Sequence, residues 1–283
     1  MKNNKIETVK EVVERIRAPY ENLDEPVTLV IGCGGAGNNL VDYFHGLGKK
    51  GITTIGINTD EEHLTQIEAD LKMFIGKTIT RSRGAGGDKE IGKQAAELAE
   101  DSLRDAVKNS DIVFLVAGLG GGTGLGATPV VGRIAREQGA VVIGIGILPF
   151  IAETARRKKA SKGFNEFKMV TESTILLDNN KLLEIAPDLS ANESLTIMNR
   201  MISQVIINTR ETLISAISAT KNLNISEIMG EVPPEDIEES EPQVERQPSV
   251  VAPVPLHANI EPEELPHPPR NNTLEDYIPD LLQ

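Results

Sequence analysis

The chain has 283 residues, of which 39% are hydrophobic and 25% charged, and its formal net charge is −13. That length allows one large domain with a sizeable core, and no run approaches the roughly 18 apolar residues of a membrane span, so a cytoplasmic protein without a transmembrane segment is expected. The single cysteine, Cys33, excludes an internal disulfide, the four histidines lack zinc-type spacing, and no basic patch interleaved with aromatic residues indicates nucleic-acid binding.

The N-terminal segment, residues 1–25, is predicted to be a helical extension that docks on the domain behind it. Its apolar residues recur at helical spacing, at Ile6, Val9, Val13 and Ile16. We expect the ordered domain to span residues 26–230.

Short β-branched runs alternate with amphipathic ones through the first two thirds of this domain. The expected strands are 27–31, 52–57, 72–75, 112–117, 140–147 and 173–178. Apolar strands that alternate with helices indicate a parallel sheet covered on both faces, a doubly wound α/β domain. In such sheets ligands bind beyond the carboxyl ends of the strands, so the loops at those ends are the expected location of a site.

The first of these loops is GCGGAGNN, residues 32–39. It satisfies G-x-G-x-x-G between a strand and a helix, and Asp60 ends the next strand at about the offset expected of a ribose-binding acid. A dinucleotide-binding oxidoreductase is therefore one alternative. The GKT tripeptide at 76–78 is not a Walker loop, because Leu71 stands where the first glycine of that motif is needed.

Two further glycine-rich loops, residues 83–92 and 117–129, each precede a predicted helix, the second helix beginning near Pro129. Three such loops are one more than a single dinucleotide needs. Glycine lets backbone amides approach phosphate oxygens, and a helix N-terminus adds the positive end of a dipole. Convergence of the three loops therefore favours a triphosphate.

A long helix is predicted over residues 190–219. Ser190 and Glu193 form an S-x-x-E capping box at its start. Its apolar residues recur at intervals of three and four, at Met198, Met201, Ile202, Val205, Ile206, Leu213 and Ile217.

The motifs GCGGAGNN, INTD, RGAGG, GGGTGLGATPVV, LPF and LLDNNKLLEI follow one another in the chain. In this order they resemble the tubulin/FtsZ superfamily of GTPases, from about residue 27 to residue 214, and the long helix resembles the central helix of that family. The resemblance implies GTP or GDP, with Mg²⁺, as ligands, and no metal ligand is directly assignable. The implied nucleotide-binding residues are Gly34, Gly35, Ala36, Gly37, Asn38, Asp60, Ala85, Gly86, Gly87, Gly122, Thr123, Gly124, Glu153, Arg157 and Asn199.

The resemblance also implies roles for these residues. Residues 34–38 would form the first phosphate loop, and residues 122–124 would wrap the diphosphate. Asp60 and residues 85–87 would lie by the γ-phosphate and Mg²⁺.

The ribose and the base are assigned in the same way. Glu153 would contact the ribose, and Arg157 the ribose or the phosphates. Asn38 and Asn199 would lie near the guanine, and Leu195 or Thr196 replaces an aromatic residue that stacks on the base in relatives.

The chain departs from the family pattern after the central helix. FtsZ carries there an Asn-x-Asp-x-x-Asp loop whose carboxylates polarise the attacking water in the next subunit. Ser226 occupies the first acidic place in this chain, which leaves Glu227 as the candidate catalytic residue. Slow or partner-dependent GTP hydrolysis is the expectation. A proline-rich segment begins where the family has its second domain.

The last part of the chain is acidic. Residues 231–283 contain thirteen acidic and two basic residues, a net of −11, which leaves −13 − (−11) = −2 for residues 1–230. Residues 231–272 are predicted to be a disordered linker. The final segment, TLEDYIPDLLQ (273–283), resembles the peptide through which FtsZ binds division proteins and membrane tethers. Its apolar residues are Leu274, Tyr277, Ile278, Leu281 and Leu282.

The sequence therefore predicts a cytoplasmic FtsZ-like GTP-binding protein of cell division or cytoskeletal organisation, which the terminal peptide brings to the division site or membrane. Its expected partners are a full-length FtsZ or further copies of itself. One alternative is a GTPase that polymerises autonomously. The oxidoreductase is more remote, because the sequence has no segment for a substrate domain.

Overall fold

The computed structural model describes residue 8, residues 25–185, residue 188 and residues 190–221. Most of the predicted N-terminal extension, Glu227, the linker and the terminal peptide lie outside this part of the chain.

The centre of the domain is a parallel sheet of six strands. Neighbouring strands follow the order β3-β2-β1-β4-β5-β6, with every pairing parallel. The strands are β1 (Thr28–Cys33), β2 (Ile52–Asn58), β3 (Leu71–Phe74), β4 (Ile112–Gly118), β5 (Val141–Leu148) and β6 (Ser173–Asp178). All six lie where the hydrophobic pattern predicts them, and the order reverses between β1 and β4, where doubly wound sheets open a ligand crevice.

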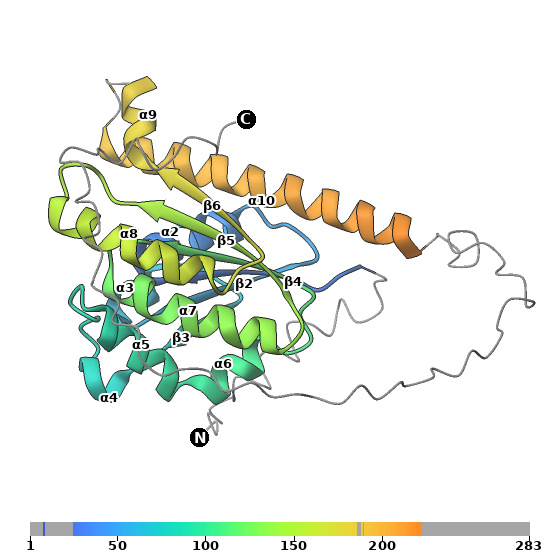
Figure 1. The fold of residues 1–283 in the computed structure, drawn as a ribbon, viewed down its shortest axis with the longest axis horizontal. Helices are drawn as coiled ribbons and strands as arrows, with labels where there is room; N and C mark the ends of the chain where they lie inside the picture. Colours follow the sequence, from blue (N-terminus) through green and yellow to red (C-terminus); the bar gives the residue numbers. More distant parts are fainter. Residues whose placement is uncertain (1–7, 9–24, 186–187, 189, 222–283) are drawn as a thin grey trace, which may run out of the picture. The chain divides into compact units, whose positions relative to one another are not determined.

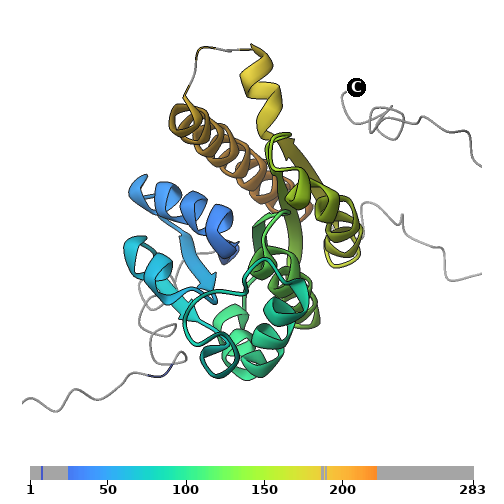
Figure 2. The same ribbon diagram turned by 90° about the vertical axis from the view of Figure 1, so that its left-hand side faces the viewer.

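Helices cover both faces of the sheet. They are α2 (Gly34–Gly46), α3 (Glu61–Gln66), α4 (Lys77–Thr80), α5 (Lys89–Leu98), α6 (Glu100–Val107), α7 (Gly122–Glu137), α8 (Thr154–Lys168), α9 (Asn179–Ile185) and α10 (Ala191–Lys221). Helices α2 and α10 lie on one face, and α5 to α8 lie on the other (Figures 1 and 2). The predicted doubly wound α/β fold is confirmed.

Each face of the sheet has its own apolar core. Alternate residues of one strand point to opposite faces, so Leu29 packs in the core shared with α5 to α8, and Val30 in the core shared with α2 and α10. Phe44 of α2 and Ile202 of α10 are nearly or fully buried in the second core. The four central strands are thus largely buried on both faces, as is usual for parallel sheets, whereas the edge strands β3 and β6 are partly exposed.

Two helices begin earlier than the sequence predicts. Helix α7 begins at Gly122 and not near Pro129, which lies inside the helix, and α2 begins at Gly34, inside the first glycine loop. Of the three glycine-rich segments, only the one before α5 is largely irregular in structure. Glycine and proline are poor helix formers, so local propensity favours a loop in both places, and tertiary packing overrides it.

The packing of α5 against α7 is the reason for several of these glycines. A Cβ on Gly92 would overlap the carbonyl oxygen of Gly122, and a Cβ on Gly126 would overlap that of Lys89. The backbones of the two helices therefore approach as closely as glycine alone allows. The glycine-rich stretch serves helix packing as well as the loop at its start.

Helix α10 follows the prediction closely. The capping box forms as expected, because Ser190 N donates to Glu193 Oε2 (2.9 Å) and Glu193 N donates to the Ser190 hydroxyl (3.3 Å). The residues of the predicted apolar stripe differ in burial. Met198, Ile202 and Ile206 are buried, whereas Met201 is 52% and Val205 38% exposed. Despite its length, neither α10 nor any other helix in the described residues is apolar enough to cross a membrane.

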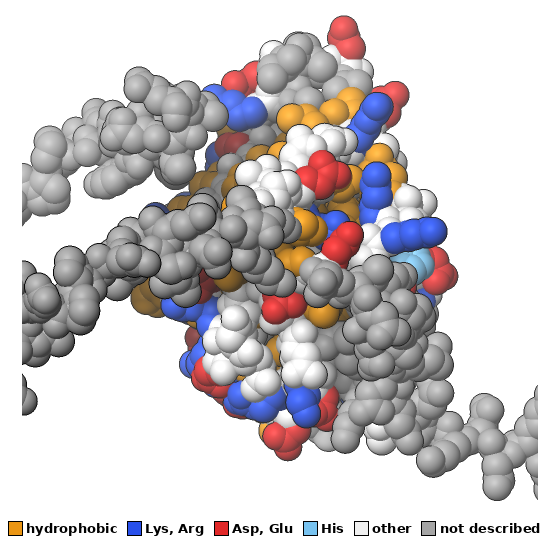
Figure 3. All heavy atoms as spheres, turned by 90° about the vertical axis from the view of Figure 1, so that its right-hand side faces the viewer, with side chains coloured by type: hydrophobic (Ala, Val, Ile, Leu, Met, Phe, Trp, Pro, Cys, Tyr) orange, Lys and Arg blue, Asp and Glu red, His pale blue; other side chains and the backbone are white. Residues whose placement is uncertain are grey.

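The surface at the amino ends of the strands carries both charged and hydrophobic side chains (Figure 3). In Figure 3, acidic and basic side chains lie interspersed among hydrophobic ones on the face visible there. Arg210 of α10 belongs to this region, donating to Thr28 Oγ1 (3.2 Å) and to Glu25 Oε2 (2.9 Å). These contacts join the C-terminal half of α10 to the start of β1.

Candidate functional site

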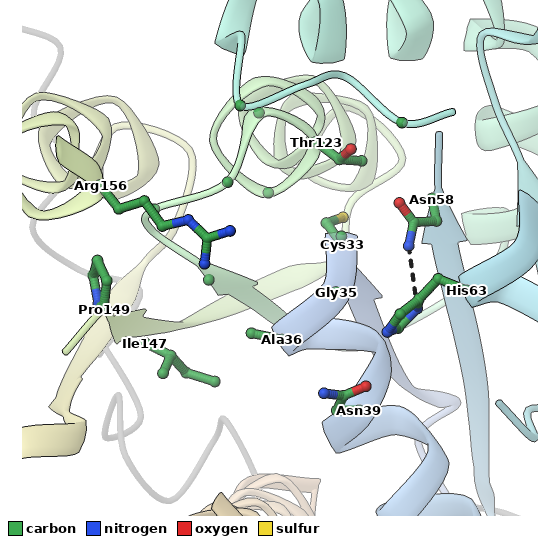
Figure 4. A pocket seen from close by; sticks show the side chains of 18 of the residues that line it. Cys33, Gly35, Ala36, Asn39, Asn58, His63, Thr123, Ile147, Pro149 and Arg156 are labelled. Carbon is green, nitrogen blue, oxygen red and sulfur yellow. Dashed lines mark hydrogen bonds between the residues drawn. The ribbon is translucent and has the colours of Figure 1, made fainter. Parts of the chain in front are cut away.

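A cavity of about 560 Å³ lies at the carboxyl ends of the strands. Its walls come from the starts of α2, α7, α8 and α9, from the loop before α5 and from the N-terminal part of α10. Figure 4 shows Arg156, His63, Thr123 and Asn39 around it. Its volume is within the range of small-molecule sites, and its position is the one that the strand order predicts.

Most of the predicted binding residues meet in this cavity. Those that line it are Gly34, Gly35, Ala36, Asp60, Ala85, Gly86, Gly87, Gly122, Thr123, Gly124, Glu153 and Asn199. Gly37, Asn38 and Arg157 are not among the lining residues. Segments far apart in the sequence are therefore brought together, and the nucleotide contacts expected of Gly37, Asn38 and Arg157 stay predictions.

The N-termini of α2 and α7 face each other in one part of the cavity. The first turns of both helices line it, and Gly34, with φ +71, would place a Cβ only 2.9 Å from the backbone nitrogen of Gly124. Neither helix has a side-chain cap or an acidic residue in its first turn. Their free N–H groups and dipoles therefore suit an anion.

Helices α3 and α5 of the same domain carry side-chain caps. Asp60 caps α3 by accepting from His63 N (3.1 Å), and Asp88 caps α5 by accepting from Glu90 N (2.8 Å). Helices α4, α6 and α8 have no side-chain cap either, so what distinguishes α2 and α7 is that their uncapped first turns meet in the cavity. A ligand can satisfy the amides that the chain itself leaves free.

The loop before α5 closes the same part of the cavity. Gly84, Gly86 and Gly87 all adopt left-handed backbone angles, with φ of +76, +58 and +78, which glycine adopts without strain. The chain anchors this loop at both ends: Gly84 N donates to Thr59 O (3.1 Å), and Lys159 Nζ donates to Gly87 O (2.8 Å). The loop is therefore fixed from β2 and from α8.

Asn38 has a structural position that the sequence does not predict. It is fully buried. In the amide orientation that its neighbours require, its nitrogen donates to Gly32 O (2.9 Å) and Ile57 O (3.2 Å), and its oxygen accepts from Asn58 Nδ2 (3.0 Å). Its side chain therefore joins α2 to the ends of β1 and β2, and the next residue, Asn39, lines the cavity.

Arg157, like Asn38, contacts other parts of the protein and does not line the cavity. It forms an ion pair with Asp178 (2.5 Å) and donates to Pro149 O (2.9 Å), so it ties the loop after β5 to the end of β6. Burial acts to raise the pKa of Asp178, but hydrogen bonds from Arg157 and Asn180 outweigh it and hold that pKa below its ordinary value. Arg156 faces the cavity instead (Figure 4).

Glu153 lines the cavity beside Arg156. Its carboxylate accepts from Phe150 N (3.1 Å) and pairs with Arg156 (2.6 Å). The acid thus holds both the turn before α8 and the arginine that points into the cavity.

The end of the cavity formed by α9 and α10 carries amides and apolar side chains. Asn179 and Asn199 line it together with Leu195 and Met198. The side-chain oxygen of Asn179 is buried and has no hydrogen-bond partner among the residues that the structure describes. A buried acceptor without a partner is unfavourable unless a ligand supplies the donor.

Several lining residues were missed by the sequence reasoning, namely Asn39, Asn58, His63, Arg83, Arg156, Asn179 and Met198. Asn179 directly follows β6, so the rule that ligands bind after the carboxyl ends of strands could have found it. His63 and Arg156 carry no such signal, because their orientation depends on how α3 and α8 pack.

The described residues contain neither a cluster of metal ligands nor a reactive thiol. No group of three or more His, Cys, Asp and Glu side chains in the described part of the chain could hold a metal ion. Cys33 is fully buried, and this burial raises the pKa of its thiol to about 12, so it is not a reactive nucleophile.

Comparison with known proteins gives consistent results. The family model for the GTPase domain of the Tubulin/FtsZ family matches residues 27–187. The chain is 42% identical to cell division protein FtsZ 2 of Methanocaldococcus jannaschii over 208 residues, which cover 74% of this chain and 54% of that protein. FtsZ 2 of Halobacterium salinarum is also 42% identical, over 68% of this chain and 49% of its own length. The chain thus spans about half the length of these curated relatives.

Solved structures agree with these matches. The fold is similar to an empty FtsZ dimer of M. jannaschii, with a TM-score of 0.65, 35% identity and coverage of 71% of this chain and 59% of that chain. It is also similar to a GTPγS-bound protofilament of CetZ2 from Haloferax volcanii, with a TM-score of 0.59, 25% identity and coverage of 71% and 61%.

Proposed function

Because this chain belongs to the tubulin/FtsZ family, we propose that it is an FtsZ-like GTP-binding protein that acts in cell division or cytoskeletal organisation. The observation that carries the proposal is the pair of uncapped helix N-termini, those of α2 and α7, that meet in a glycine-lined cavity. Backbone amides and helix dipoles at such a place bind phosphate without a Walker lysine.

The phosphate chain would lie between these two helix starts and residues 84–87. Mg²⁺ would be held mainly by phosphate oxygens, and Asp60 is the lining carboxylate nearest to that loop, since its bridge partner is Arg83. One carboxylate plus phosphates is an ordinary Mg²⁺ environment. The bound ion would neutralise charge on the terminal phosphates.

The base would lie at the opposite end, between α9 and α10. Asn179 and Asn199 offer amide donors and acceptors for the edge of guanine. Leu195, which is 36% exposed, offers an apolar contact to the ring in place of an aromatic side chain. Glu153 remains the proposed ribose contact, and Arg156 takes over the role first assigned to Arg157.

Hydrolysis by the isolated chain is proposed to be slow. The described carboxylates that line the cavity are Asp60 and Glu153. Asp60 is the proposed Mg²⁺ neighbour, and Glu153 pairs with Arg156, so the proposal assigns neither of them to the activation of water. A partner subunit, or Glu227 acting in a neighbouring copy, would supply that group.

The proposed partners are a full-length FtsZ and further copies of this chain. The sequence resemblance extends the proposal to the C-terminal peptide, residues 273–283, as the contact to a division protein or membrane tether. Recruitment to a division site from the cytoplasm would follow from that contact.

The fold alone does not discriminate against a dinucleotide enzyme, because the strand order β3-β2-β1-β4-β5-β6 is also that of dinucleotide-binding domains. Family membership removes the oxidoreductase from consideration. An autonomously polymerising GTPase remains compatible with the family, and assembly measurements separate it from the proposal.

Equilibrium binding of GTP, GDP and ATP to the purified protein tests the proposal directly. We expect both guanine nucleotides to bind and ATP to bind at least tenfold more weakly. Gly34→Ala should lose nucleotide affinity, because its Cβ would crowd Gly124, whereas Gly46→Ala should not, because no atom lies within 4 Å of that position. Equal affinity for ATP and GTP would overturn guanine specificity.

Light scattering and phosphate release with GTP test the proposed slow hydrolysis and the proposed dependence on a partner. The proposal expects little turnover by the chain alone and a change in assembly or turnover when full-length FtsZ is added. Filaments that form from the chain alone, with turnover that rises with its concentration, would favour the autonomous polymerising GTPase.

A further inference from the structure

His63 is a cavity-lining residue to which the proposed function assigns no role. It lies in the first turn of α3, and its imidazole points into the cavity from the side opposite Arg156 (Figure 4). A Cβ placed on Gly35 would lie 3.9 Å from Nε2 of His63, so this nitrogen lies beside the first turn of α2. No described residue accepts a hydrogen bond from Nε2, whereas Nδ1 contacts Asn58.

The orientation of the Asn58 amide is fixed by its neighbours. Its oxygen accepts from Thr59 N (2.9 Å) and Asp60 N (3.3 Å). Its nitrogen must then face the other way, where it lies 3.0 Å from the amide oxygen of Asn38 and 3.4 Å from Nδ1 of His63. Asn58 is therefore a donor toward His63.

The tautomer of His63 follows from this contact. A hydrogen on Nδ1 would point at the amide hydrogens of Asn58, so Nδ1 accepts and the ring carries its hydrogen on Nε2. This N–H points into the cavity beside the uncapped start of α2. The ring therefore adds a side-chain donor to the backbone donors of that helix.

We propose that His63 is a phosphate-binding residue, whose Nε2–H donates to an oxygen of the nucleotide's phosphate chain while Asn58 holds the ring and its tautomer in place. The inference rests on the proposed function, because it takes a nucleoside diphosphate or triphosphate as the ligand. It adds a side-chain contact from α3, between the first turn of α2 and the loop that follows Arg83.

Three substitutions of His63 separate a donor at Nε2 from a merely structural role. The amide nitrogen of Gln can occupy the place of Nε2, and that of Asn the place of Nδ1, whereas Ala has neither. A hydrogen bond to a charged group corresponds to about a tenfold change in affinity or more. We therefore expect GDP to bind about tenfold more weakly to His63→Ala and His63→Asn, and nearly as tightly to His63→Gln as to the wild type.

His45→Ala is the matched control, because His45 contacts Thr54 and Asp70 outside the cavity. It should leave GDP affinity unchanged. Thermal unfolding of each variant shows whether an affinity change reflects a loss of folded protein.

Nitrogen NMR of labelled histidine gives a readout that stability does not affect. The spectrum of the nucleotide-free protein should show His63 with a hydrogen-free Nδ1 and a protonated Nε2, and GDP should shift the Nε2–H resonance. The signals are assigned by their loss in His63→Gln.

The outcomes are distinguishable. If the wild type binds no guanine nucleotide, the proposed function fails. If the wild type binds GDP and His63→Ala binds it equally well, only the inference about His63 fails. A hydrogen found on Nδ1, or equal losses in the Gln and Asn variants, would also overturn it.

Discussion

At the scale of single residues, two neighbouring pairs decide what lines the cavity. Asn39 and Arg156 face it, while Asn38 and Arg157 hold the walls from behind. Successive residues of a helix point about 100° apart, so a shift of one position separates a ligand contact from a structural contact. The Arg157–Asp178 pair is the structural contact best suited to a stability measurement, because both side chains are only about one fifth exposed.

Asp178→Asn should destabilise the protein by about 1–3 kcal/mol at pH 7, since it leaves Arg157 without its charge partner and solvent screens only part of that loss. The pKa of Asp178 is lowered in the folded state, so its contribution is present above about pH 4, the unfolded value, and is lost as the pH falls through the lower folded value. Urea unfolding at several pH values measures this dependence.

The difference in unfolding free energy between wild type and Asp178→Asn should therefore narrow below pH 4. Glu211→Gln is the control, because Glu211 is exposed on α10, and it should change little at any pH. A difference for Asp178→Asn that stays constant down to pH 2 would contradict the assignment.

The residue types of the candidate site were more predictable from the sequence than the directions of its side chains. Glycines after strand ends mark the site because their position in the chain fixes their position in the fold, as Gly34 and Gly122 show. The direction of a side chain such as Asn38 or Arg157 depends on buried partners, Asn58 and Asp178, that no local pattern reveals.

At the scale of elements, the strands and the start of α10 were predictable, and the starts of α2 and α7 were not. Apolar runs of β-branched residues specify buried parallel strands through composition alone. The first turns of α2 and α7 consist largely of glycine and small residues, and they are helical because α5 and the strand ends pack against them. Helix propensity could not anticipate that packing.

Gly126→Ala tests the close approach of α5 and α7. The added Cβ would overlap the backbone of Lys89 and Lys93, so the two helices must separate, at a destabilisation of typically about 1–3 kcal/mol. Gly46→Ala, at the end of α2, meets no atom within 4 Å and should be neutral or slightly stabilising. Chemical unfolding midpoints compare the two variants, and equal midpoints would show that the approach is less tight than described.

At the scale of the whole molecule, the site belongs to one part of the chain. All lining residues fall between Cys33 and Asn199, so none of them belongs to the acidic segment, residues 231–283. Binding by these residues is therefore expected to be independent of that segment.

Removal of residues 231–283 should leave GDP affinity unchanged within about twofold, although the net charge falls in magnitude from −13 to −2. Long-range repulsion from the acidic segment is weak at physiological salt, where the Debye length is about 8 Å. Titration calorimetry of the two forms at 0.15 M and at low salt measures the effect. A loss of affinity on truncation at both salt concentrations would place part of the site beyond residue 230.

The uncapped helix starts have a thermodynamic consequence for the nucleotide-free protein. The N-termini of α2 and α7 bring two positive dipole ends together with no acidic side chain in either first turn. An anion that binds there completes the electrostatics of the fold itself, and at a hundred times its dissociation constant it adds about 2.7 kcal/mol to stability. Nucleotide concentration in the cell would then set not only the occupancy of this protein but also the fraction of it that stays folded.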